Sequence, residues 1–267
     1  MTHRGTAALL LGSTLLFNAC KKDDDDIVVV KPDVTFYGIT DNNQLLTFNA
    51  QTPEASSASV TIAGLQAGEQ LLGIDFRPAT GQLYGIGNTS RLYVINPETG
   101  VARALGTAAF TPALNGTIVG FDFNPTVDRI RLVTDRGQNL RLHPETGAVA
   151  ATDADLNPGT PAVTAAAYNN NVAGAATTTL FDLDSGTDKL YRQDPPNNGT
   201  LVEIGALGVD AEAANGFDIS GTKGVAYAVL TVGEKTKLYT INLQTGAATG
   251  VADFPVSVLA MAVGLGF

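Results

Sequence analysis

Three aspartates occupy one equivalent position in three similar segments of the chain: Asp75, Asp122 and Asp218. At the same position of two further segments stand Ala167 and Ala262. In a fold that gathers these segments around an axis, three carboxylates repel one another unless they are protonated or bridged by a cation. Carboxylate oxygens are ligands suited to calcium or magnesium. The three aspartates are therefore candidate ligand-binding and metal-ligating residues, with Ca²⁺ as the candidate cofactor.

A structural role for the same aspartates is the alternative. Each carboxylate can accept hydrogen bonds from backbone N–H groups of its own or the next segment, which satisfies a buried polar group and fixes the repeat. Repetition favours this interpretation, because a structural role recurs with each repeat while a functional site usually needs an asymmetric set. The alanines at positions 167 and 262 keep the cation site open.

A dense polar cluster between residues 128 and 141 is the second candidate site. The chain has only 16 basic residues, and four arginines fall here, at positions 129, 131, 136 and 141. Guanidinium groups bind carboxylates and phosphates bidentately, which makes Arg131, Asn139 and Arg141 candidate ligand contacts. The alternative is a charged strand face, with Arg141 paired to Asp128 or Asp135 across a hairpin.

Familiar catalytic sets find little support in the sequence. Beyond the first twenty residues the only histidine is His143, which precedes Pro144 at the position that Asn96 holds in the preceding repeat. This pattern predicts a turn residue rather than the base of a Ser-His-Asp triad. Residues 182–188 (DLDSGTD) invite comparison with calcium loops, but they lack the frame of an EF-hand and fit a hairpin turn equally well. No Walker loop, nucleotide fingerprint, HExxH or paired-cysteine zinc motif is present.

The N-terminus predicts export and a lipid anchor. Arg4 supplies a positive charge, residues 7–17 carry none, and Ala19 precedes Cys20, so residues 1–19 form a signal peptide too short to span a bilayer. Cys20 is the only cysteine, and its position resembles the lipobox of bacterial lipoproteins, in which the cysteine is lipidated. Phe17 and Asn18 differ from the residues usual there, so an ordinary secretory signal with a leftover thiol is the alternative.

Residues 20–33 are expected to be the lipidated cysteine and an acidic tether. Lys21 and Lys22 are followed by four aspartates, a run that resembles export signals on surface lipoproteins of some Gram-negative bacteria; the alternative is a solvated linker. We therefore expect an outer-membrane-anchored lipoprotein of the cell envelope, facing the periplasm or the cell surface. The mature chain has no further cysteine for disulfides or thiol catalysis. A net charge of −10 argues against nucleic acid or an anionic membrane surface as a partner.

The elements that position these residues form an internal repeat, and repeats decide the fold. Residues 71–106 and 118–153 align without a gap and share an identical Pro-Glu-Thr-Gly turn. The first copy resolves into four short apolar runs, at residues 72–76, 82–86, 91–95 and 101–105. Proline and glycine separate the runs at positions that suit turns. Weaker copies lie at 163–205 and 215–254, so each unit is expected to be a four-stranded antiparallel meander.

The two ends of the chain complete a fifth unit. Residues 259–263 look like a first strand without partners, while residues 36–40, 44–49 and 59–65 look like second, third and fourth strands without a first. Pairing the two ends closes the ring. We therefore predict an all-β fold over residues 34–267, a β-propeller of five four-stranded blades closed by its N- and C-terminal strands. An open β-solenoid is the alternative, but it gives no reason to split a unit between the ends.

Three segments carry a resemblance to a known family: residues 73–87 (GIDFRPATGQLYGIG), 127–147 (VDRIRLVTDRGQNLRLHPETG) and 177–201 (TTTLFDLDSGTDKLYRQDPPNNGTL). They resemble the bacterial family named domain of unknown function 4394, over nearly all of residues 34–267. The resemblance implies an exported propeller-like lipoprotein and no particular activity. More distantly the pattern is similar to secreted propellers that range from binding modules to lactonases and dehydrogenases, among which fold alone does not choose.

Three functions remain after these observations. We expect a noncatalytic binding or interaction module, a monomer that presents the rim and channel of its propeller to a protein or small-molecule ligand and meets the membrane only through Cys20. The alternative is a divalent-cation-dependent hydrolase or lactonase with its site at the channel. A structural protein of the envelope is the third. The geometry of the three aspartates distinguishes the first two.

Overall fold

The computed structural model describes residues 1, 33–212, 216–221 and 223–266. The chain divides into residues 1–30 and residues 31–267, and every described strand belongs to the second unit. The expected signal peptide beyond Met1, and Cys20 with most of its tether, lie outside the described residues. In the part of the chain that is described, no helix is long and apolar enough to cross a membrane.

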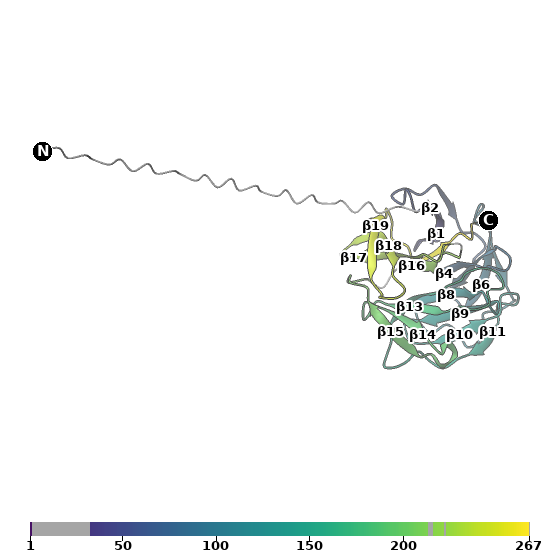
Figure 1. Ribbon diagram of the computed structural model, residues 1–267. Coiled ribbons are helices and arrows are strands. Elements are labelled where there is room, and N and C mark those ends of the chain that lie inside the picture. The colour runs from purple at the N-terminus through teal and green to yellow at the C-terminus, as the bar shows by residue number, and fades with distance from the viewer. Residues whose placement is uncertain (2–32, 213–215, 222, 267) are drawn as a thin grey trace. The chain divides into compact units, whose positions relative to one another are not determined.

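Five four-stranded antiparallel sheets form the blades of a β-propeller (Figure 1). Blade 1 runs in the order β20 (Ala260–Val263), β1 (Thr35–Ile39), β2 (Gln44–Asn49) and β3 (Ala58–Thr61). Blade 2 contains β4 (Leu71–Phe76), β5 (Leu83–Gly87), β6 (Arg91–Ile95) and β7 (Ala102–Leu105). Blade 3 contains β8 (Val119–Asn124), β9 (Arg129–Thr134), β10 (Asn139–Leu142) and β11 (Val149–Thr152).

The last two blades follow the same plan. Blade 4 contains β12 (Val163–Tyr168), β13 (Leu180–Asp184), β14 (Lys189–Gln193) and β15 (Leu201–Ala206). A short 3₁₀ turn, η1 (Pro196–Asn198), connects its last two strands. Blade 5 contains β16 (Gly216–Ile219), β17 (Ala226–Val232), β18 (Lys235–Ile241) and β19 (Ala248–Asp253).

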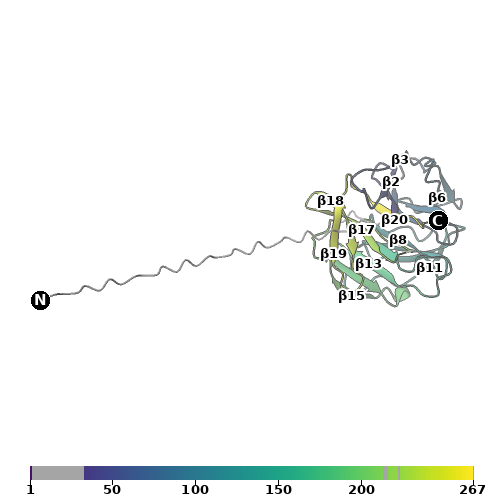
Figure 2. The same ribbon diagram turned by 45° about the horizontal axis from the view of Figure 1, so that its top comes forward.

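The first strands of the blades surround the axis. Contacts between these inner strands run from β20 to β4, β8, β12 and β16, and then back to β20, which closes the ring (Figure 1 and Figure 2). Every residue of β4 and β12 is buried, because each inner strand lies between two neighbouring blades. The outermost strands, such as β3 and β11, are largely exposed or half-buried. Apolar residues on both faces of a strand therefore mark the inner part of each blade.

Glycine at three inner-strand positions lets the blades approach closely. A Cβ on Gly120 would lie 2.5 Å from the Cβ of Ala166 in the next blade, and one on Gly216 would lie 2.5 Å from the Cβ of Met261. A Cβ on Gly73 would lie 2.8 Å from the Cβ of Phe121. Real Cβ atoms do not pack at such distances. Each of these glycines stands two residues before one of the three aspartates, on the same face of its strand.

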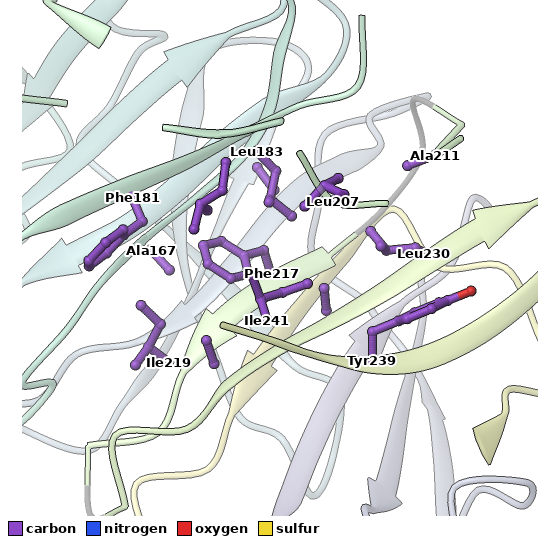
Figure 3. Packing of buried hydrophobic residues seen from close by; sticks show 14 residues of the cluster. Ala167, Phe181, Leu183, Leu207, Ala211, Phe217, Ile219, Leu230, Tyr239 and Ile241 are labelled. Atoms are coloured by element: carbon purple, nitrogen blue, oxygen red, sulfur yellow. The ribbon is translucent and has the colours of Figure 1, made fainter. Parts of the chain in front are cut away.

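Apolar clusters hold neighbouring blades together. The cluster between blades 4 and 5 places Phe217 of β16 among Ala167, Leu183 and Ile241 (Figure 3). Among the described residues, four of the five clusters contain twelve to fourteen buried side chains, whereas the one between blades 3 and 4 contains seven. Buried polar groups take up the rest of that interface.

The predicted closure is confirmed. Strand β1 pairs with β20, with Phe36 opposite Val263 and Ile39 opposite Ala260, so the two ends of the chain share blade 1. The predicted run at 59–65 is too long, because β3 ends at Thr61. Beyond it, Ala63 leaves blade 1 and forms a parallel bridge with Val101 of the next repeat.

Candidate functional site

Asp75, Asp122 and Asp218 come together at the axis of the propeller. Each residue is 1% exposed, and one carboxylate oxygen from each lies within 4.8 Å of the others. They come from the inner strands β4, β8 and β16, so the repeat alignment brings its three equivalent positions to one place. Ala167 and Ala262, which replace the aspartate in blades 4 and 1, are fully buried.

Backbone N–H groups orient these carboxylates. Asp75 accepts a hydrogen bond from Phe76 N at 2.7 Å and another from Phe123 N of the next blade at 2.7 Å. Asp218 repeats this arrangement with Ile219 N and Val263 N, both at 2.5 Å. Each of these carboxylates therefore connects its own inner strand to the next one, as the structural interpretation predicts.

Asp122 keeps the bond to the next blade but not the one to its own strand, because the N–H of Phe123 donates to Asp75 instead. Its Oδ1 accepts a hydrogen bond from Tyr168 N of blade 4 at 3.0 Å. The two interpretations of the aspartates are thus compatible: the carboxylates accept backbone N–H groups, and their oxygens also converge. The three aspartates therefore link neighbouring blades through hydrogen bonds and also form a cluster of acidic groups at the axis.

Burial makes this cluster costly to ionise. Burial raises the pKa of Asp75 well above its usual range, the nearby Asp218 raises it further, and two N–H bonds act against both effects. Burial likewise raises the pKa of Asp122, assisted by Asp75 and Asp218. Burial raises the pKa of Asp218 to about 7 despite its own N–H bonds. The three carboxylates need either shared protons or a cation to offset their charge.

The dimensions of the axis suit a single ion. Because the three oxygens lie within 4.8 Å of one another, an ion in their plane can lie within about 2.8 Å of all three, which allows the 2.3–2.6 Å of calcium–oxygen bonds. A cavity between the inner strands, whose lining includes Gly73, Gly216 and Ala260 but none of the three aspartates, has a volume of about 10 Å³. That is about the volume needed to hold one water molecule, so an organic molecule does not fit there.

Arg131, Asn139 and Arg141 also come together, in a network between blades 3 and 4. The Arg131 guanidinium is 2% exposed and donates to Asn139 Oδ1 at 2.7 Å, Asp153 Oδ2 at 2.7 Å and Asn197 Oδ1 at 2.8 Å. Burial acts to lower the pKa of Arg131, but Tyr168 and Asp153 outweigh it and the pKa is raised. Asn139, fully buried, donates to the carbonyl oxygens of residues 154 and 196.

The expected partners of Arg141 are wrong. Arg141 contacts Asp153 bidentately, with Nε–Oδ2 and Nη2–Oδ1 both at 2.8 Å. Asp128 pairs instead with Arg77 of blade 2, while Asp135 accepts the backbone N–H of Thr117 at 3.0 Å. Asp153 holds Arg141 because β11 pairs with β10 and its end brings the carboxylate beside that arginine.

The structure contains the turn predicted at His143 and the hairpin turn considered for residues 182–188. His143 Nδ1 accepts the N–H of Glu145 at 3.2 Å, as Asn96 Oδ1 accepts that of Glu98 at 2.9 Å in the preceding repeat. In residues 182–188, Asp184 Oδ1 accepts the N–H groups of Gly186 and Thr187, which makes the segment a hairpin turn between β13 and β14.

Asp182 is a buried acid that sequence reasoning misses, because it treats the residue as part of that turn. The residue is fully buried, and neither carboxylate oxygen has a hydrogen bond in the part of the chain that is described. Burial raises the pKa of Asp182 to about 8; Arg131 acts to lower it and Asp184 to raise it. An acid between two large apolar residues, Phe181 and Leu183, is the sequence signal that identifies it.

Comparisons with known proteins identify a family but no activity. A search of curated proteins finds no match. Among solved structures, the chain is similar to one described as "Dihydro-heme d1 dehydrogenase NirN in complex with DHE", with a TM-score of 0.41 and 12% identity. That match covers 84% of this chain and 44% of the other, and a likeness this remote carries no functional argument. The family described as "Domain of unknown function (DUF4394)" matches residues 44–264, and this chain therefore belongs to that family.

Proposed function

We propose that this protein is an exported, lipid-anchored propeller that acts as a noncatalytic binding module and holds a divalent cation, Ca²⁺, on its axis. The observation that carries the cation site is the convergence of Asp75, Asp122 and Asp218, whose oxygens lie within 4.8 Å of one another. A cation offsets the repulsion among three buried carboxylates. Their backbone N–H bonds hold two of them in position before the ion arrives.

Burial of the three aspartates favours this role over the hydrolase or lactonase. A catalytic metal needs an open coordination position that a substrate can reach. Each aspartate is 1% exposed, and the cavity between the inner strands, which reaches Ile74 and Phe217 but none of the aspartates, has a volume of about 10 Å³. An ester or lactone carbonyl therefore does not reach an ion held there, whereas a structural ion needs no such access.

The lipid anchor and the location rest on the sequence. The signal segment, Cys20 and the acidic residues after it support attachment of the propeller to the outer membrane, facing the periplasm or the cell surface. The first strand begins at Thr35, so residues 20–33 would serve as the tether. A Cys20→Ser variant should lose metabolic labelling by a palmitate analogue and move from the membrane fraction to the soluble fraction. Unchanged labelling would contradict the anchor.

Calcium titration by calorimetry tests the cation site. The protein used is the processed chain, residues 20–267, with Cys20→Ser so that it is not lipidated and stays in solution. We expect one saturable site, and a melting temperature that rises with calcium and falls with chelator. Asp122→Asn should abolish binding, because it removes one of the three negative charges. The variant should still fold, because the Asn oxygen can accept the N–H of Tyr168. Asp253→Asn, on a side chain that is 83% exposed, is the control and should bind as the parent does. Absence of binding in the parent would overturn the cation site and leave shared protons to neutralise the cluster.

A further inference from the structure

A cavity of about 450 Å³ opens on blade 4, near the start of β12 and the end of β13. Its volume falls within the range of small-molecule sites, roughly 300–1,000 Å³. Apolar side chains form part of the wall, among them Pro158, Pro161 and Leu201. Polar groups of the wall come from Asp184 and Glu203. None of the three axial aspartates lines this cavity.

The polar wall carries negative charge at fixed positions. Asp184 is 2% exposed, and its carboxylate accepts the N–H groups of Ala162, Gly186 and Thr187 at 2.9–3.0 Å. Glu203 is half-exposed, and its Oε2 accepts a hydrogen bond from Lys189 Nζ at 2.8 Å. Lys189 therefore already pairs with Glu203 and would compete with an incoming cation.

We propose that this cavity binds an alkylammonium group, either of a free amine or of a lysine side chain in a peptide. The carboxylates of Asp184 and Glu203 attract the cation, and Tyr191, which also lines the cavity, brings an aromatic ring of the kind that binds cations. The apolar wall accommodates the alkyl stem. The net charge of −10 steers cations toward the molecule. This inference supplies a ligand for the binding module proposed above and in that sense rests on it.

Asp182 does not line this cavity but neighbours two residues that do. It pairs across the strands with Tyr191 and stands two positions before Asp184 on the same face of β13. The charge of Arg131, in blade 3, acts to lower the pKa of Asp182. Because burial keeps Asp182 protonated near neutral pH, a cation in the cavity favours its ionised form. Binding at pH 7 should therefore release protons.

Calorimetry with two probes tests the proposal on the processed chain with Cys20→Ser, at a fixed calcium concentration. The probes are n-pentylammonium and Nα-acetyl-lysine methylamide, and n-pentanol is the uncharged control. Glu203→Gln and Tyr191→Leu should each weaken binding by about tenfold. Lys189→Met should strengthen it, because it removes the competing cation. Glu98→Gln, on an exposed turn of blade 2, is the matched control and should change nothing.

Glu203→Gln should lower the affinity for the amine and Lys189→Met should raise it, and a folding defect would not explain a rise. Melting curves of each variant confirm that it is folded. Binding of both probes, or of one alone, supports the cavity and identifies the source of the ammonium group. Equal binding of n-pentanol, or unchanged affinity in both Glu203→Gln and Lys189→Met, would overturn the proposal. Asp122→Asn should still bind the amine, so failure of the axial cation site is distinguished from failure of this one.

Proton release provides the second readout. The apparent binding enthalpy at pH 7 should vary with the ionisation enthalpy of the buffer, and Asp182→Asn should remove part of that variation. An enthalpy that does not depend on the buffer in the parent chain would overturn the coupling to Asp182.

Discussion

Asp182 illustrates how a single side chain connects burial to pH. Its pKa is raised to about 8 in the folded protein, against about 3.9 for an unperturbed aspartate. Between these values the folded state holds a proton that the unfolded state has released. The free energy of unfolding therefore falls as the pH rises from about 4 to about 8, and this contribution to stability is complete only below the unfolded pKa.

An Asp182→Asn variant should lose this dependence. From pH 5 to pH 8 the parent should lose more stability than the variant, by a difference bounded above by roughly 4 kcal/mol. Urea unfolding at the two pH values measures it, and comparing the same pH step in both proteins removes the contribution of the axial aspartates. Equal losses in the two proteins would show that Asp182 does not bind the proton.

Asp153 supports a prediction about the network between blades 3 and 4. It accepts hydrogen bonds from both Arg131 and Arg141. Asp153→Ala leaves the buried Arg131 without its carboxylate and should cost about 3–5 kcal/mol of unfolding free energy. Asp253→Ala, which breaks the exposed pair with Lys237, should cost about 0–1 kcal/mol. Similar costs in denaturant unfolding would contradict the distinction between the two pairs.

The sequence predicts some residues of these clusters and not others. The axial aspartates can be found because one register relates the repeats, so equivalent positions meet at the axis. Arg131, Asn139 and Arg141 are grouped correctly because they share one hairpin. Asn197 cannot be assigned to them from the sequence, since it comes from η1 of the next blade and reaches Arg131 only after the blades pack. The proline, asparagine and glycine around it predict a turn and nothing more.

At the scale of elements, the alternation and turn signals locate the strands closely. The predicted run at 91–95 coincides with β6, and the run at 72–76 differs from β4 by one residue. The excess length predicted for β3 has a tertiary cause. Residue 63 is apolar and extended, but it pairs with Val101 of blade 2 rather than within its own sheet.

The close approach of inner strands predicts a sharp response to added volume. Gly120→Ala places a Cβ 2.5 Å from that of Ala166, so β8 and β12 must move apart. The expected cost is about 1–3 kcal/mol of unfolding free energy, measured by denaturant unfolding. Gly250→Ala is the matched control, because its Cβ would meet nothing closer than a ring atom of Tyr239 at 3.8 Å. Equal stability of the two variants would mean that the inner strands are not packed this tightly.

At the scale of the molecule, ring closure depends on the last strand. Removal of residues 260–267 deletes β20, exposes the edge of β1 and takes from Asp218 the N–H of Val263. We expect the melting temperature to fall by roughly 10 °C or more, because several kcal/mol are lost from a chain of this size. Removal of residues 266–267 alone is the control and should leave the melt unchanged. A cooperative melt near that of the parent after the longer deletion would contradict closure by the two ends.

The split repeat favours a closed ring over an open solenoid, because the closed ring explains a lone first strand at one end and three later strands at the other. The chemistry at the centre depends on distances that the repeat does not encode. Alignment places Asp75, Asp122 and Asp218 in one layer, but only the packed structure brings their oxygens within 4.8 Å. The cation site that we propose at the axis depends on this convergence.

A crystal structure grown with calcium, with anomalous scattering data collected, tests the cation site most directly. We expect an anomalous peak on the axis, about 2.3–2.6 Å from carboxylate oxygens of Asp75, Asp122 and Asp218, and no such peak in the Asp122→Asn variant. A parent structure with no peak, in which the three carboxyl groups hydrogen-bond directly to one another, would show that protons neutralise the cluster and would contradict the cation site.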